Sequence, residues 1–344
     1  MTVTTAATPE AWADDAFGLL AEAYAAGARV TRPVVGGVPT RLLEVGDPAR
    51  PTVVFLHGTG GHLEAFAHVL APFARWFHCV AYDLPGHGWS GPPAVTDGGY
   101  EVPAYTDHLD AVLDHLRVAP GGGGAALVGV SLGGWVAAHH AATRPGRVDA
   151  LVLVAPGGVR ADPAVMGALR SLSSAAVEAP GEAAVRTRLE WLVADPSTVT
   201  AALVATRLRL YQQPGAAERM AGLLCLQEPD VRRRNMISAA AAESIRAATL
   251  VLWGTKDPTG PAEAGADFAR RVPGARFEAL PELGHWPQFE DPAGFTALGT
   301  TFLRTAFERT AFERTAFEPP AVRSADAPAD QPAHPAGPRN LKGV

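Results

Sequence analysis

One serine of the chain lies in a setting that favours nucleophilic chemistry. The segment 129–133 reads Gly-Val-Ser-Leu-Gly, and it joins an apolar run at 127–130 to a small-residue helical pattern at 132–143. A serine at such a turn from strand to helix is held in a strained conformation, and the flanking glycines let strand and helix approach closely. The alternative is a glycine-lined turn that only packs tightly. We predict that Ser131 is a catalytic nucleophile.

Backbone N–H groups in two places are candidates for stabilising the oxyanion that a serine attack creates. The N–H of Leu132 opens the helix that follows the serine, where the helix dipole favours negative charge. A second donor is expected from the loop His-Gly-Thr-Gly-Gly at 57–61, which follows an apolar strand at 52–56. We expect that donor to be the N–H of Thr59 or Gly60. The loop lacks the Gly-Lys-Ser/Thr ending of a phosphate-binding loop.

A base and an orienting acid follow the last two expected strands. Asp257 follows the strand at 249–253, and His285 follows the strand at 275–280. The carboxyl ends of parallel strands lie at one edge of a sheet, so both side chains are expected near Ser131. Imidazole can take the serine proton and return it to the leaving group. The chain order Ser, Asp, His is that of a known triad arrangement, whereas an ordinary loop role for Asp257 is the alternative.

The other histidines have no spacing typical of metal ligands, so no metal site is expected. We expect His57 and His87, which lie in glycine-rich loops, to hold loop backbone instead.

Strands and helical patterns alternate along most of the chain, which predicts an α/β fold with a parallel sheet covered on both faces. Between 157 and 246 the patterns are helical only, and they are interrupted by proline and glycine at four points. This block predicts a lid inserted over one edge of the sheet. The expected strands are 30–35, 40–45, 52–56, 77–82, 127–130, 148–154, 249–253 and 275–280.

The pattern divides the chain into an N-terminal helix, a core in two halves, a helical cap and a tail. The boundaries are 1–29 for the helix, 30–157 and 247–303 for the core, 158–246 for the cap and 304–344 for the tail. The tail begins with three copies of Arg-Thr-Ala-Phe-Glu, which can extend the last helix as far as Pro319-Pro320. Its remainder is rich in alanine and proline, a composition typical of disorder.

Composition excludes several classes of partner. The net charge is −6 and no basic run exceeds three residues, so nucleic acid is not expected to bind. Two cysteines exclude a disulfide framework. Residues 1–12 lack the features of a signal peptide, and the uncharged stretch 118–143 contains too many glycines and histidines for a membrane span. We therefore expect a cytoplasmic enzyme that acts on a small molecule without cofactor, metal or membrane; a homo-oligomer remains open.

The motifs together resemble the α/β-hydrolase superfamily over about 30–302. A nearer resemblance, to the meta-cleavage product hydrolases, rests on three segments. These are His-Gly-Thr-Gly at 57–60, Gly-His-Trp-Pro-Gln-Phe-Glu at 284–290, and Thr-Arg-Leu-Arg at 206–209 ahead of a Pro-Gly pair. Members of that family cut a carbon–carbon bond in the dienoates made by aromatic ring fission. The resemblance implies an eight-stranded, mostly parallel sheet with a helical cap inserted after the sixth strand.

The same resemblance implies that Arg207 and Trp286 face the substrate. Independently, Arg207 lies among apolar residues on one face of a predicted helix, with Leu203, Val204 and Tyr211 at helical spacings. A guanidinium there requires an anion, and a substrate carboxylate bound bidentately would provide one. An internal ion pair with a core Asp or Glu is the alternative for Arg207, and packing under the cap is the alternative for Trp286.

These features predict a serine hydrolase that cleaves a carbon–carbon bond in a 2-hydroxy-6-oxo-dienoate. Val130 stands where the family commonly has asparagine, which leaves a carboxylesterase or lactonase open on the same triad. A ligand receptor on a hydrolase scaffold is the alternative from another class, and the intact Ser, Asp and His set argues against it.

Overall fold

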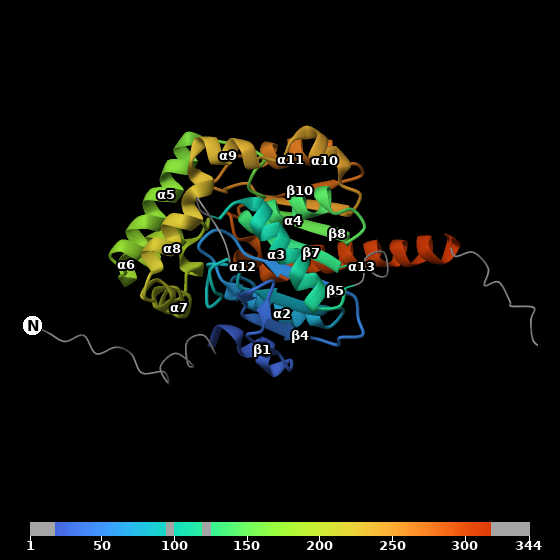
Figure 1. Ribbon diagram of the computed structural model, residues 1–344, viewed down its shortest axis with the longest axis horizontal. Helices are drawn as coiled ribbons and strands as arrows, with labels where there is room; N and C mark the ends of the chain where they lie inside the picture. The colour runs from blue at the N-terminus through green and yellow to red at the C-terminus, as the bar shows by residue number, and fades with distance from the viewer. Residues whose placement is uncertain (1–17, 94–99, 119–124, 318–344) are drawn as a thin grey trace, which may run out of the picture.

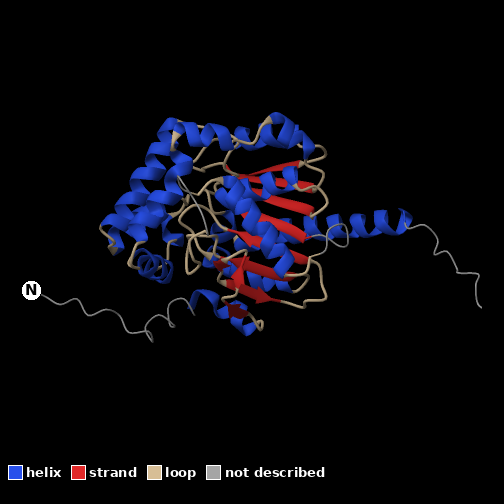
Figure 2. Cartoon of the chain, viewed as in Figure 1, coloured by secondary structure: helices blue, strands red, loops and turns tan. Residues whose placement is uncertain are grey.

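A computed structural model describes residues 18–93, 100–118 and 125–317, and its centre is a sheet of eight strands (Figure 1 and Figure 2). The strands are β1 (Arg29–Thr31), β4 (Leu42–Val45), β5 (Thr52–Leu56), β6 (His78–Tyr82), β7 (Ala125–Val130), β8 (Val148–Val154), β9 (Ala248–Gly254) and β10 (Arg276–Leu280). Their order across the sheet is β1-β4-β6-β5-β7-β8-β9-β10. β4 runs antiparallel to β1 and β6, and all other neighbours are parallel. This architecture confirms the predicted eight-stranded, mostly parallel sheet.

Every residue of β6 and β7 is buried, as are nearly all of β5, β8 and β9. Strands with two buried faces are nearly continuous apolar runs, which explains why the sequence located them well. The predicted strand at 30–35 is divided between β1 and β2 (Val34–Val35), whereas the predicted strand at 40–45 is β4, which begins two residues later. β2 forms a separate hairpin with β3 (Val38–Pro39), which lies ahead of the range predicted for the second strand.

Helices of the core cover both faces of the sheet. They are α2 (Ala67–Ala74), preceded by the short helix η1 (Leu63–Phe66), α3 (Val102–His115), α4 (Leu132–Thr143), α11 (Ala262–Arg271), α12 (Pro287–Glu290) and α13 (Pro292–Phe317). α13 packs against α2, and α3 packs against α4. None of the helices in the described ranges is long and apolar enough to cross a membrane.

The helical insertion follows β8, which is the sixth strand of the large sheet in chain order. It comprises α5 (Pro163–Glu178), α6 (Glu182–Glu190), η2 (Pro196–Thr198), α7 (Ala201–Tyr211), α8 (Ala216–Leu223), η3 (Leu224–Gln227), α9 (Pro229–Asn235) and α10 (Ala239–Ser244). Figure 1 shows α5 to α8 gathered at one end of the sheet, while α13 projects from the opposite end. α10 packs against α4 and α11, so the end of the predicted cap segment lies with the core.

Helix α13 continues past the predicted boundary at 303/304 to Phe317, as expected from the extension of the last helix into the repeats. No helix breaker occurs before Pro319, and the first repeat packs on the core. The ring of Phe307 lies 5.9 Å from that of Phe77, and the guanidinium of Arg304 lies 4.0 Å from the ring centre of Trp76. Residues 318–344 lie outside the described residues, as does most of the predicted N-terminal helix, of which 18–25 are helical.

Candidate active site

Ser131 occupies the turn between β7 and α4 in a strained conformation, with φ 54° and ψ −113°. Its N–H donates to the carbonyl oxygen of Val154 over 2.9 Å, which fixes the turn to the neighbouring strand. A Cβ on Gly133 would collide with the carbonyl oxygen of Leu56, and one on Gly129 would collide with the backbone of Gly133. The two glycines are therefore needed for the close approach that holds Ser131 in this conformation.

The structure brings His285 and Asp257 together in a buried pair. Nδ1 of His285 lies 2.7 Å from Oδ2 of Asp257. The other carboxylate oxygen of Asp257 accepts hydrogen bonds from the N–H and the hydroxyl of Thr259, both over 2.7 Å. Because Asp257 bonds Nδ1, Nε2 of His285 is left to exchange a proton with a nucleophile.

Thr259 was not identified from the sequence. Its position two residues after Asp257 is the spacing of an Asx turn, and that spacing was the available signal.

The loop that carries His285 is bound to the cap. The N–H of His285 donates to the carbonyl oxygen of Leu192 over 2.7 Å. The carboxylate of Glu290 accepts hydrogen bonds from the N–H groups of Gly284, Trp286 and Ala194 at 2.8–3.1 Å. These bonds join the histidine loop to residues 192–194, so the cap and the histidine are positioned together.

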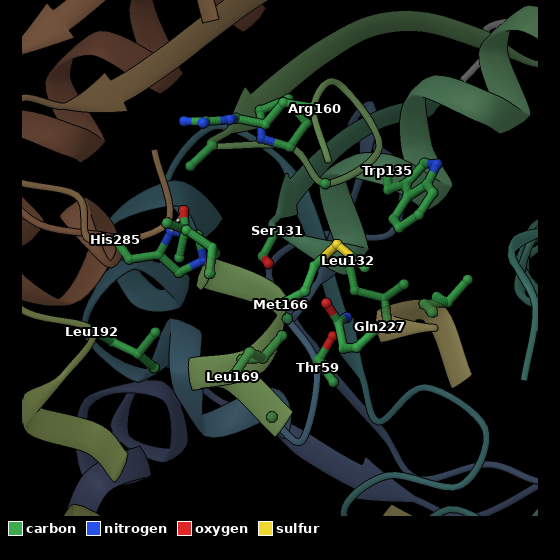
Figure 3. Close-up of a pocket in the computed structure, with 18 of the residues that line it drawn as sticks. Thr59, Ser131, Leu132, Trp135, Arg160, Met166, Leu169, Leu192, Gln227 and His285 are labelled. Carbon is green, nitrogen blue, oxygen red and sulfur yellow. Dashed lines mark hydrogen bonds between the residues drawn. The ribbon is translucent and has the colours of Figure 1, made fainter. Parts of the chain in front are cut away.

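A cavity between core and cap contains Ser131 and His285 in its wall, together with Leu132 and Thr59. Figure 3 shows Ser131 between His285 on one side and Leu132 on the other. Leu132 is the first residue of α4, and the N–H groups of a helix's first turn have no acceptor within the helix. Leu132 and Thr59 therefore lie where oxyanion donors are expected.

Gly60 lies outside this cavity and lines a neighbouring one. Its φ of +67° belongs to the left-handed region, and its carbonyl oxygen accepts hydrogen bonds from Arg207 and, over 3.3 Å, from Tyr211. Of the two donors expected from the loop, the structure thus favours Thr59 over Gly60.

His57 and His87 hold loop backbone, as the sequence predicted. Nε2 of His57 accepts a hydrogen bond from the N–H of Leu84 over 3.0 Å, and its Nδ1 lies 2.8 Å from the carbonyl oxygen of Gly58. Nδ1 of His87 lies 3.0 Å from the carbonyl oxygen of Pro85. Burial, and then the neighbouring His87, lower the pKa of His57 well below its ordinary value. A neutral His57 suits this structural role.

Arg207, on α7, is buried with 2% of its surface exposed. Its Nη1 donates to the carbonyl oxygen of Gly60 and to the hydroxyl of Tyr211, whereas Nε and Nη2 have no hydrogen-bond partner among the residues that the structure describes. The guanidinium carbon lies 5.8 Å from the ring centre of Trp286, which lines the cavity. Across the described ranges no carboxylate forms a salt bridge with Arg207. The internal ion pair considered as its alternative role is therefore absent from the described structure.

Another buried arginine, Arg41, is fully paired. Its guanidinium bonds Glu64 at 2.5 Å and Asp83 at 3.3 Å. His62 completes the cluster, because its Nδ1 lies 2.7 Å from Glu64. Although burial acts to raise the pKa of Glu64, the charges of Arg41 and His62 hold it below the ordinary value. In this cluster two carboxylates pair with one guanidinium, so Arg41 needs no anionic ligand.

A model of the alpha/beta hydrolase fold family matches residues 51–292 of the chain. The chain therefore belongs to the α/β hydrolase fold family, which confirms the predicted superfamily and hydrolase class.

Two curated relatives carry different names. The chain is 31% identical over 272 residues to 2-hydroxymuconate semialdehyde hydrolase from Pseudomonas sp. (strain CF600), covering 77% of this chain and 90% of that protein. It is 32% identical over 257 residues to the dihydrolipoyllysine-residue acetyltransferase component of an acetoin cleaving system from Pseudomonas putida, covering 74% of this chain. The match spans 64% of the length of that second protein.

Among solved structures, the chain is similar to 2-hydroxy-6-oxo-6-phenylhexa-2,4-dienoate hydrolase from Rhodococcus sp. strain RHA1. The TM-score is 0.70 at 22% identity, covering 80% of this chain and 99% of that one. A meta-cleavage product hydrolase from Pseudomonas fluorescens IP01 also gives a TM-score of 0.70, at 24% identity, covering 81% of this chain and 98% of that one. These likenesses show a shared fold.

Proposed function

We propose that the chain is a serine hydrolase that cleaves a carbon–carbon bond in a 2-hydroxy-6-oxo-dienoate. The observation that carries the proposal is Arg207, a buried cation beside Trp286 that has no acidic partner among the described residues. A buried guanidinium costs several kcal/mol unless an anion compensates its charge. A dienoate carboxylate would do so, and the similarity to a 2-hydroxymuconate semialdehyde hydrolase supports the same substrate class.

In the proposed reaction Arg207 holds the carboxylate of the substrate while the bound dienol becomes a ketone. The enol proton leaves its oxygen and a proton is added to the distal carbon of the diene. His285, whose Nδ1 is held by Asp257, then takes the hydroxyl proton of Ser131 through Nε2. The freed oxygen attacks the distal carbonyl, and the N–H groups of Leu132 and Thr59 stabilise the oxyanion.

Collapse of this intermediate breaks the carbon–carbon bond. The bonding electrons pass to the dienoate fragment, which takes the proton held by His285 and leaves as a hydroxydienoate. The other fragment remains as an acyl ester on Ser131. Water, deprotonated by His285, hydrolyses the ester, releases a carboxylic acid and restores the serine.

A carboxylesterase or lactonase is the second candidate, and Val130 favours it. This side chain is apolar and 1% exposed, and it directly precedes Ser131. It offers no polar contact to the enol end of a dienoate, whereas an ester does not require one. A non-catalytic receptor is disfavoured because Ser131, His285 and Asp257 are all present around one cavity and its supporting loop.

The test follows the visible absorbance of a ring-fission dienoate beside hydrolysis of nitrophenyl esters. Ser131→Ala should lose turnover by up to ~10⁶-fold if the triad acts as a unit. The substitution Arg207→Met should lower kcat/KM for the dienoate about 100-fold. It should lower kcat/KM for a neutral ester far less, because only the dienoate has the carboxylate that Arg207 would bind. Arg209→Met, which removes an arginine two residues away on the same helix, is the matched control. Rapid ester turnover, stable dienoates and an indifferent Arg207 would establish the esterase instead.

A further inference from the structure

Besides Arg207, the cap contains a second buried arginine, and this one lies in the wall of the cavity that contains Ser131. Arg188, on α6, is 4% exposed and lines that cavity. Its Nε donates to the hydroxyl of Ser173 on α5 over 3.0 Å, whereas its Nη1 is buried without a hydrogen-bond partner. Within the described ranges, no carboxylate pairs with it. The guanidinium carbon lies 5.4 Å from the ring centre of Trp191. Arg188 therefore presents to the cavity a cation that has no carboxylate partner among the described residues.

Arg188 lies close to the residues that position the histidine. Leu192, four residues later, lines the same cavity, and its carbonyl oxygen accepts the N–H of His285. Leu192 lies two residues beyond the end of α6, so Arg188 is close to this contact along the chain. Its position is thus within reach of a substrate that reacts at Ser131.

The other arginines of the cavity wall have acceptors. Arg160 forms a salt bridge with Asp162 at 2.7 Å. Arg232 donates from Nε and Nη2 to the carbonyl oxygen of Arg160 over 3.0 and 2.7 Å. Arg188 differs from both because a nitrogen of its guanidinium remains buried and unbonded. A buried donor without an acceptor costs free energy, which a bound ligand can recover.

Arg188 and Arg207 together leave two buried positive charges to be balanced. Burial lowers the pKa of Arg188 to about 10, and the charge of Arg207 acts in the same direction while Tyr211 opposes it. At neutral pH Arg188 still carries its proton. One substrate carboxylate would neutralise only one of the two guanidinium groups.

We propose that Arg188 determines specificity by binding a second carboxylate, at the acyl end of the substrate. The proposal rests on the proposed function, in which Arg207 binds the carboxylate of the dienoate. The preferred substrate then carries a carboxylate at each end, and hydrolysis releases a dicarboxylic acid beside the hydroxydienoate. Charge-assisted bonds from a guanidinium to a carboxylate are among the stronger hydrogen bonds in proteins, which suits such discrimination.

The experiment compares two dienoates that differ only in whether the acyl group ends in a carboxylate or in the isosteric primary amide. The wild-type protein should prefer the carboxylate by about 10- to 100-fold in kcat/KM. Arg188→Met should bring this ratio close to one. Arg186→Met removes a partly exposed arginine from the same helix and should leave the ratio unchanged.

An unchanged ratio in Arg188→Met, or a wild-type ratio near one, would overturn the proposal. Equal losses on both dienoates would show that Arg188 serves the same carboxylate as Arg207, and would overturn it too. Arg188→Gln repeats the test if the methionine variant does not fold, since glutamine also removes the charge.

A second pair of substrates tests the role of Arg188 without requiring carbon–carbon cleavage. One is the mono-nitrophenyl ester of glutaric acid, which ends in a carboxylate, and the other is the same ester with a primary amide in place of the carboxylate. If dienoates persist but the glutarate ester is preferred and Arg188→Met abolishes the preference, the carbon–carbon reaction is wrong and the role of Arg188 stands. If dienoates are cleaved without preference, the reaction stands and the role of Arg188 is wrong.

Discussion

Buried arginines occur in both the core and the cap, but their surroundings differ. In the core, Arg41 is paired with the carboxylates of Glu64 and Asp83. In the cap, Arg207 and Arg188 are at least as buried, yet each retains at least one guanidinium nitrogen without a hydrogen-bond partner among the described residues. The core thus provides carboxylate partners for its buried arginine. We infer that the cap leaves its charge for a ligand to balance.

We expect the paired arginine of the core to serve stability and the unpaired arginines of the cap to serve ligand binding. A buried cation that is paired contributes to the folded state mainly because losing it would strand its partners. A buried cation that is unpaired costs stability in the empty protein, and such a cost is typical of sites that are completed by a substrate.

The largest expected difference is in stability after removal of each arginine. Arg41→Met strands Glu64 and Asp83, and should lower the free energy of unfolding by about 3–5 kcal/mol. Arg207→Met strands no carboxylate, and the carbonyl oxygen of Gly60 keeps its bond from Tyr211. Its effect should be within about 1 kcal/mol. Urea unfolding of the two variants measures both values, and equal losses would mean that Arg207 is structural.

Acid should destabilise the core more than the cap, because the buried histidines lie in the core and the cap segment 158–246 contains no histidine. Burial lowers the pKa of His87, His108 and His140 to about 4. The unfolded chain binds these protons near pH 6.5 and the folded chain only near pH 4, so the folded state loses stability as the pH falls between those values. Each histidine contributes about 1.4 kcal/mol per pH unit, which amounts to about 3 kcal/mol per histidine over this interval.

Urea midpoints measured between pH 7 and pH 4.5 check this slope. His140→Gln should reduce it by about 1.4 kcal/mol per pH unit, while His115→Gln, which removes an exposed histidine, is the matched control. A stability that does not change over this range would show that the buried histidines are not neutral in the folded protein.

Local motifs allowed much of the core to be predicted from the sequence. The turn at Ser131 is specified by neighbouring glycines, and the long apolar strands are specified by burial on both faces. The order of the strands then placed Asp257 and His285 at the same edge, where they form a pair at 2.7 Å. In each case the information lies within a few residues or in the regular alternation of strand and helix.

The remaining features depend on contacts between distant segments. The choice between Thr59 and Gly60 depends on which of them lines the cavity that the cap and the core form together. The absence of an acid beside Arg207 is a property of the packed interior and has no sequence signature. Arg188 had the same signal as Arg207, an arginine at helical spacing from apolar residues, and was overlooked because no motif accompanied it.

Binding of an intact ring-fission dienoate to the Ser131→Ala variant tests most directly whether the substrate carboxylate pairs with the guanidinium of Arg207. Without the serine hydroxyl the ligand is not cleaved, so titration calorimetry gives its Kd. The double variant Ser131→Ala/Arg207→Met should bind at least about 10-fold more weakly than Ser131→Ala, because the carboxylate loses its charged partner. Equal Kd values would contradict the assignment of the unpaired guanidinium to the substrate.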